Sequence, residues 1–158
     1  MKLSELFAQG RFVVTSEIGP PKGVDMGEVL EVAELLKGRV DAANVTDQQS
    51  SVMRLGSLAV CHILKERGLE PIFQVTCRDR NRIALQSDLL SAYSLGIENV
   101  LCLTGDHVTL GDHPDAKPVF DLDSVSLLMA AGRLQAGYDL AAQELRGSPQ
   151  FCLGAVVA

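Results

Sequence analysis

Long hydrophobic runs, an excess of positive charge and closely spaced cysteine pairs are all missing from this 158-residue sequence. No apolar run approaches the roughly 18 residues that a membrane-spanning helix needs. The formal net charge of −6 argues against binding nucleic acid or an anionic membrane through overall electrostatics. Near the N-terminus, Glu5 interrupts the apolar stretch that a secretory signal peptide would require. A cytoplasmic location is therefore expected.

The four cysteines are scattered and form no C-x-x-C pair, which argues against a zinc site or a disulfide framework. We expect Cys61, Cys102 and Cys152 to be buried structural thiols. Cys77 alone, at the end of a predicted strand, could lie near a ligand.

What the sequence does contain is an alternation of β-branched apolar runs with helical patterns. Strands are predicted near residues 11–18, 41–47, 71–77, 100–103 and 151–158, and helices near residues 25–36, 52–67, 83–95 and 124–134. Asp25 and Glu28 have the spacing of a capping box at the start of the first of these helices. Near-continuous apolar strands alternating with helices predict an α/β fold, in which helices cover a parallel sheet.

Two architectures fit a single domain of residues 1–158 with five strand–helix units. One is a complete flavodoxin-like open sheet, which would bind FMN as an electron carrier. The other is an incomplete (β/α)8 TIM barrel with about five of its eight units. The barrel is favoured because no G-x-G-x-x-G turn follows the first strand. The sequence also ends inside an apolar run, with no helix to cover it.

Polar residues close four of the predicted strands at a regular interval. Glu17, Thr46, Thr76 and Thr104 follow one another at spacings of 28 to 30 residues, the length of one strand–helix unit. The carboxyl ends of parallel strands meet at one edge of a sheet, where α/β enzymes build their sites. A functional site at this edge is therefore predicted.

A long polar loop follows the fourth strand, between residues 104 and 123. Loops of this length are often functional. His107 and His113 each follow an aspartate in a local near-repeat, which leaves open a metal site. A loop that clasps a ligand is the favoured interpretation.

Four strand-end motifs, in order and at the expected spacing, resemble the methylenetetrahydrofolate reductase family. They are TSEIGPP at residues 15–21, NVTD at 44–47, QVTC at 74–77 and LTGD at 103–106, and the sequence KP at 117–118 adds to them. The resemblance extends from about residue 12 to the end of the sequence and is closest to versions from anaerobic one-carbon metabolism. It covers the first five units of the family's FAD-binding TIM barrel.

The resemblance implies a role for individual residues. Glu17 matches the glutamate that acts as general acid, since opening the folate ring requires protonation of a weakly basic nitrogen. Asp106 matches the aspartate that lies near flavin and folate and adjusts the reactivity of both. The implied cofactor-binding residues are Thr46, Asp47, Gln74, Thr104, Gly105, Asp106, Phe120 and Asp121. No metal ligand is implied. The chain departs from some family members, which carry histidine in place of Gln74 or arginine in place of Thr104.

Each of these residues also has a structural interpretation. Glu17 could be a solvated carboxylate at a strand end, Asp106 a turn cap, and Thr46 or Gln74 a satisfied polar side chain inside a barrel. Arg78, Arg80 and Arg82 could neutralise a pyrophosphate or a polyglutamate tail, or could form a solvated loop.

The activity implied by the resemblance is a flavin-dependent oxidoreductase. It would pass hydride from NADH or NADPH through FAD to 5,10-methylenetetrahydrofolate and give 5-methyltetrahydrofolate, in one-carbon and methionine metabolism. A tetrahydrofolate substrate is implied, together with either a homo-oligomer or an electron-delivering partner subunit. The alternative is a partner-dependent or non-catalytic FAD- or folate-binding subunit of a larger redox complex.

Overall fold

The order of the strands decides between the two architectures. The computed structural model describes residues 2–156 and contains a five-stranded, fully parallel sheet. Its strands are β1 (Thr15–Ile18), β2 (Ala42–Val45), β3 (Pro71–Thr76), β4 (Asn99–Leu103) and β5 (Cys152–Ala155). They are hydrogen-bonded in the order β1-β2-β3-β4-β5. A doubly wound sheet reverses direction after its first strand, whereas a barrel adds each strand on the same side. The expected incomplete barrel is confirmed, and the sheet is not closed.

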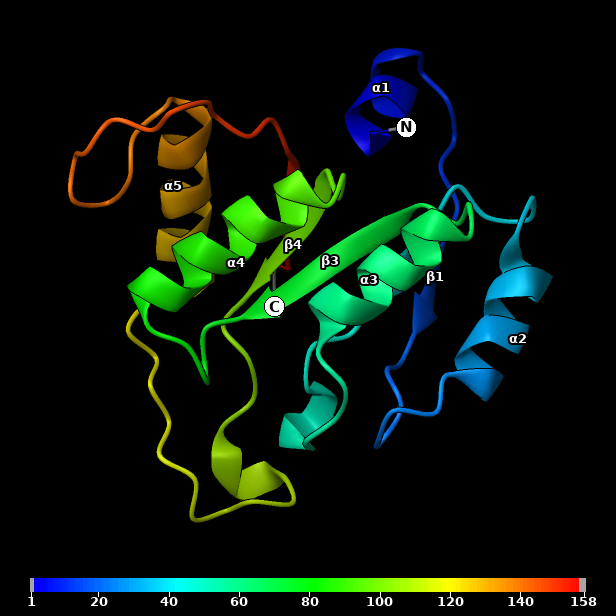
Figure 1. Cartoon of the computed structure of the whole chain (residues 1–158), viewed down its shortest axis with the longest axis horizontal. Coiled ribbons are helices and arrows are strands. Elements are labelled where there is room, and N and C mark those ends of the chain that lie inside the picture. The colour runs from blue at the N-terminus through cyan, green and yellow to red at the C-terminus, as the bar shows by residue number, and fades with distance from the viewer. Residues whose placement is uncertain (1, 157–158) are drawn as a thin grey trace.

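The helices that follow the strands all lie on one face of this sheet (Figure 1). They are α2 (Gly27–Leu36), α3 (Ser57–Glu66), α4 (Arg82–Ser94) and α5 (Ser124–Gln135). The core lies between them and the sheet, where Leu64, Leu89 and Leu127 of the helices pack with Phe73 and Val100 of the strands. Each fully buried leucine contributes about 1.5–3 kcal/mol relative to an exposed one.

The opposite, inner face of the sheet is covered at one end by a helix that the sequence did not predict. The helix α1 (Leu3–Ala8) packs Leu3 and Leu6 against Ala42 and Ile72. The backbone N–H of Leu3 also donates to Oδ1 of Asn99 at 2.8 Å. Figure 1 shows α1 at the end of the sheet opposite the loops that follow the strands. It therefore closes the amino end of the inner face and leaves the carboxyl end open.

Two helices begin later than the sequence predicts. The N-cap of α2 is Met26, without a side-chain hydrogen bond, and Asp25 instead accepts from the N–H of Gly27 at 2.9 Å. The expected capping box with Glu28 does not form.

The predicted strand over residues 151–158 is observed as β5, and residues 157 and 158 lie outside the described residues.

The segment before α3 was predicted to be helical from residue 52, but α3 begins at Ser57. Long-range hydrogen bonds hold the preceding residues in a non-helical path. The Gln48 side chain binds both backbone groups of Arg54, and the N–H of Leu55 donates to the carbonyl of Pro21 at 2.9 Å. A short 3₁₀ turn, η1 (Gln49–Ser51), lies just before this segment.

Candidate active site

A cavity of about 500 Å³ lies at the carboxyl ends of the strands. Strand alternation aims every second residue at the inner face, so each strand ends with a side chain directed into this space. Its lining includes the predicted site residues Glu17, Thr46, Asp47, Gln74, Thr104, Gly105 and Asp106. These residues, which are far apart in sequence, therefore lie together at one cavity, whereas Phe120 and Asp121 do not line it.

Glu17 and Asp106 are the two carboxylates of the cavity whose side chains have no partner in the described part of the chain. Both residues are exposed, one at the end of β1 and the other just after β4. Neither side chain makes a hydrogen bond or ion pair with any of residues 2–156. Both carboxylates are thus free to interact with a ligand.

Thr46 and Gln74 supply neighbouring polar groups deeper in the cavity. Thr46 follows Val45 and Gln74 follows Phe73, and these two preceding residues are partners in the β2–β3 register. Both side chains are buried, and Oγ1 of Thr46 has no hydrogen-bond partner in the part of the chain that the structure describes. A buried hydroxyl without a partner costs free energy, so this atom is suited to a ligand that completes its hydrogen bonding.

Asp47 lines the same cavity, but its carboxylate is already engaged within the protein. The side chain is 0% exposed. It accepts from the N–H of Thr76 at 2.9 Å and from the Thr76 hydroxyl at 3.0 Å. Arg80 donates to both carboxylate oxygens, at 2.7 and 3.2 Å, and also pairs with Asp88 at 2.9 Å. Asp47 therefore fastens β2 to β3 and to the loop after β3.

The turn after β4 has a backbone shape that requires glycine. Gly105 has φ of +92°, and a Cβ atom there would lie 3.1 Å from Cβ of Thr76 and 3.3 Å from Cβ of Arg78. The hydroxyl of Thr104 accepts from the N–H of Ser124 at 3.0 Å, at the start of α5. The turn is thus packed against the end of β3 on one side and tied to a helix on the other.

Phe120 and Asp121 lie in an adjoining cavity of about 440 Å³, which shares Thr104 and Gly105 with the first. The ring of Phe120 stacks on that of His107, with centroids 6.2 Å apart and planes 15° apart. Asp121 accepts two hydrogen bonds from the Arg82 guanidinium, at 2.8 and 3.0 Å. These hydrogen bonds, with one from the Arg82 backbone N–H, lower the pKa of Asp121 to about 2.

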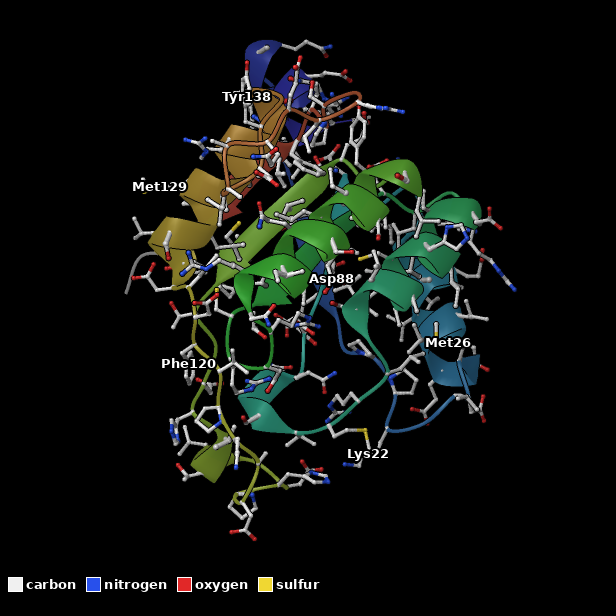
Figure 2. The ribbon with its side chains drawn as sticks, turned by 60° about the vertical axis from the view of Figure 1, so that its left-hand side comes forward. Lys22, Met26, Asp88, Phe120, Met129 and Tyr138 are labelled. Carbon is white, nitrogen blue, oxygen red and sulfur yellow. The ribbon has the colours of Figure 1, made fainter. Side chains whose placement is uncertain are left out.

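The loop between Asp106 and Asp123 is fastened across the top of the sheet. Asp112 pairs with Lys22, which follows β1, and accepts from the N–H of Met53 at 3.0 Å. Hydrogen bonds from Lys22 and His113 lower the pKa of Asp112 well below its usual range. Figure 2 shows Lys22 and Phe120 at the end of the molecule where these loops gather, and Tyr138 at the far end.

The two histidines of this loop have partners of their own. Nδ1 of His107 lies 3.0 Å from the Thr109 hydroxyl, and Nδ1 of His113 lies 2.8 Å from a carboxylate oxygen of Asp112. Among residues 2–156 no cluster of three or more histidine, cysteine, aspartate or glutamate side chains has the arrangement of a metal site.

Cys61, Cys77 and Cys102 are fully buried, as the sequence indicated for Cys61 and Cys102, and Cys152 is partly buried. Burial raises the pKa of Cys77 to about 11 and that of Cys102 to about 12. The cysteine that lines the cavity is Cys102, not the expected Cys77.

Arg78 is the main residue of the site that the sequence did not assign to it, since it was named only as one of three arginines in a loop. Its side chain is 2% exposed and lines the cavity. Three arginines alternate along residues 78–82, and the sequence offered no sign that one is buried, one pairs with Asp47 and one pairs with Asp121. The available signal was proximity, because Arg78 follows the end of β3 by two residues.

Two comparisons with known proteins bear on the family of this chain. Residues 2–135 match the sequence profile of the methylenetetrahydrofolate reductase family. A 5,10-methylenetetrahydrofolate reductase from Pectobacterium carotovorum subsp. carotovorum is 33% identical over an alignment of 133 residues that covers 82% of this chain and 43% of that protein. The chain thus spans less than half the length of that relative. In the described residues no helix is long and apolar enough to cross a membrane. This chain belongs to the methylenetetrahydrofolate reductase family.

Proposed function

We propose that this chain takes part in the reduction of 5,10-methylenetetrahydrofolate to 5-methyltetrahydrofolate, with FAD as the redox cofactor and NADH or NADPH as electron donor. The observation that carries the proposal is the cavity at the carboxyl ends of the strands. It brings Glu17 and Asp106, two carboxylates that are unpaired within residues 2–156, together with the buried polar side chains of Thr46 and Gln74.

The chemistry of the cavity fits a flavin. The hydroxyl of Thr46 lacks a partner among residues 2–156, and the flavin ring offers both hydrogen-bond donors and acceptors. Gly105 lines the cavity and is only partly buried, so a ligand can reach this turn. When bound, FAD supplies the hydride transfer that no amino-acid side chain provides. Thr46, Gln74 and Gly105 would hold its ring, and Phe120 and Asp121 would lie near the rest of the dinucleotide.

Glu17 is proposed as the proton donor. Its protonated carboxyl O–H would donate to a nitrogen of the folate's five-membered ring, so that the C–N bond breaks as that nitrogen takes the proton. The residue is exposed at the end of β1, so the carboxylate left behind can regain a proton from water. General acid catalysis of this kind typically contributes about 10²–10⁴-fold in rate.

Asp106 is proposed to adjust the electrostatics of the reacting groups. A carboxylate held beside the ligand stabilises positive charge that develops on the substrate as its ring opens. It also disfavours added negative charge on a neighbouring redox group.

Two substitutions separate the proposed roles. Both are tested in the completed protein, that is, this chain together with the remainder or partner that closes its barrel. Thr46→Val is expected to weaken FAD binding, which is measured by the quenching of flavin fluorescence. Glu17→Gln is expected to leave FAD binding intact and to lower folate reduction about 10²-fold or more. If the completed wild-type protein neither contains flavin nor binds added FAD, the proposal fails.

The open sheet supports a second candidate, a subunit that binds FAD or folate only within a larger redox complex. β1 and β5 each pair on one side only within the described residues. Size-exclusion chromatography with multi-angle light scattering distinguishes the two candidates. A flavin-loaded, active assembly of this chain alone would exclude the requirement for a partner.

A further inference from the structure

Arg78 is a buried cation whose hydrogen bonds join three loops of the cavity. Its Nη1 donates to the carbonyl of Asp106 at 3.2 Å, and its Nη2 donates to the carbonyl of Gln48 at 3.3 Å. Its own carbonyl accepts from the N–H of Val119 at 2.7 Å. The loops after β2, β3 and β4 therefore meet at this one residue.

The charge of Arg78 is balanced by its neighbour in sequence. Asp79 accepts from Nε at 3.0 Å and from Nη2 at 2.8 Å, and the Asp79 side chain is 41% exposed. Four of the five N–H groups of the guanidinium are thus used inside the protein. A guanidinium engaged in this way is better suited to holding the backbone than to binding an anionic ligand.

The two backbone segments that accept hydrogen bonds from Arg78 contain residues with positive φ. Gly105 precedes Asp106 and has the wide conformational freedom of glycine. Gln48 has φ of 51°, and Ser50 and Ser51 also have positive φ. Left-handed backbone at such residues is strained and persists only where the surroundings enforce it.

Asp106 depends on this arrangement because its carboxylate has no partner of its own among residues 2–156. Besides Arg78, the Ser51 hydroxyl contacts the Asp106 carbonyl, at the long distance of 3.5 Å. The position of the free carboxylate therefore depends on the backbone that Arg78 holds, because no side-chain contact with residues 2–156 fixes it.

We propose that Arg78 is a positioning residue, which aims the Asp106 carboxylate into the cavity by fastening the Asp106 carbonyl to the loop after β2. This inference rests on the proposed role of Asp106 and adds the element that fixes its geometry. The proposal concerns the ligand-free protein as well, because every contact that supports it lies within the chain.

The first test is hydrogen–deuterium exchange of the protein without ligand, followed by mass spectrometry of peptides that cover residues 46–53 and 104–110. Arg78→Met is expected to speed exchange in both segments at least about tenfold, since the loss of a hydrogen bond to a charged group shifts a local opening equilibrium by at least that factor. Arg78→Lys should recover part of the protection, because an ammonium can still reach one carbonyl. Arg67→Met, at the exposed end of α3, removes the same charge and should change neither segment.

The second test is a double-mutant cycle on the midpoint potential of bound flavin in the completed protein. If Arg78 acts through Asp106, the shift caused by Asp106→Asn should fall by at least half in the Arg78→Met background. A merely structural role would leave that shift unchanged.

The outcomes are distinguishable. Unchanged exchange in both loop segments of Arg78→Met, or equal acceleration throughout the chain, would overturn the positioning role whether or not flavin binds. Additive shifts in the cycle would overturn it as well. Loop exchange that responds as expected, in a completed protein that binds no flavin, would support the positioning of Asp106 and instead refute the proposed flavin function.

Discussion

Some side chains of the cavity form hydrogen bonds with residues about 30 positions away in sequence. Asp47 shows how much such a contact is expected to contribute to the free energy of unfolding. Its buried carboxylate accepts hydrogen bonds from Thr76 and Arg80. Removing one member of a buried ion pair leaves the other charge without compensation, which typically costs about 3–5 kcal/mol. The contribution of Asp47 is thus expected to appear first as stability.

We predict that Asp47→Ala lowers the free energy of unfolding by about 3–5 kcal/mol, measured by urea denaturation. The control is Glu34→Gln, which removes an exposed ion pair with Lys37 three residues away and should cost less than about 1 kcal/mol. A similar small cost for both substitutions would contradict the interpretation of Asp47 as a structural carboxylate.

The buried thiols make stability sensitive to alkaline pH. Burial raises the pKa of Cys77 to about 11 and of Cys102 to about 12, from an ordinary value of 9.0. Because the folded-state pKa is the higher one, the stabilisation is fully present below pH 9. It is lost as pH rises from about 9 towards the folded value, by about 1.4 kcal/mol per pH unit for Cys102.

We therefore predict that the free energy of unfolding, measured in reducing buffer at a series of pH values from 8 to 11, falls less steeply with pH in Cys102→Ala than in the wild type. The substitution also removes a buried sulfur and shifts the whole curve. The slope, not the offset, carries the test. Parallel curves for the two proteins would show that Cys102 does not contribute to the alkaline loss.

For individual residues, the sequence predicted where a side chain lies better than which groups it contacts. Glu17, Thr46, Gln74 and Asp106 could be placed at one edge because strand ends gather there whatever the side chains do. The engagement of Asp47 and the burial of Arg78 could not, since both depend on which loops approach one another in three dimensions. In the sequence alone, a buried arginine cannot be told from a solvated one, because both can have similar neighbouring residues.

Among the elements, the turn between β4 and the long loop both lines the cavity and has a backbone conformation that favours glycine. Gly105 has positive φ and lies against the side chains of Thr76 and Arg78. By contrast, Gly132 is an exposed glycine within α5, with no atom within 4 Å of the position its Cβ would take. The same substitution is therefore expected to have opposite effects at these two positions.

We predict that Gly105→Ala destabilises the protein by about 1–3 kcal/mol, because alanine pays for the left-handed conformation and crowds Thr76. Gly132→Ala should instead stabilise it by about 0.5–1 kcal/mol, the usual gain of alanine over glycine in a helix. Urea denaturation of both variants checks the signs. Destabilisation by both would indicate that α5 does not tolerate a methyl group there, and stabilisation by both would refute the assigned turn geometry.

Elements were predictable where local pattern decides and not where tertiary contacts do. The helix predicted from residue 83 is α4, beginning at Arg82, and Asn81 caps it with its own side chain. The helix predicted from residue 52 begins at Ser57, because Gln48 and Pro21 hold the residues before it. The short helix α1 was missed because only its contact with the sheet gives it a buried face.

In the whole molecule, the inner face of the sheet has two ends with different roles: one holds the candidate site and the other is packed against a helix. The carboxyl end holds the cavity, and the amino end is closed by α1. Because α2, α3, α4 and α5 cover only the outer face, α1 stabilises inner-face residues that would otherwise meet water (Figure 1). Changes in α1 should therefore affect stability without altering the site.

We predict that Leu6→Ala lowers the free energy of unfolding by about 2–3 kcal/mol, the lower part of the range for buried leucines, because its pocket lies at the edge of the molecule. Phe7→Ala, one residue further along α1, is the matched control: Phe7 is 55% exposed, and Leu6 is 4% exposed. Its cost should stay within about 0.5 kcal/mol. Flavin affinity of the completed protein, measured by fluorescence titration, should be the same in both variants. A loss of affinity in Leu6→Ala, under conditions where it remains folded, would show that the two ends of the inner face are coupled.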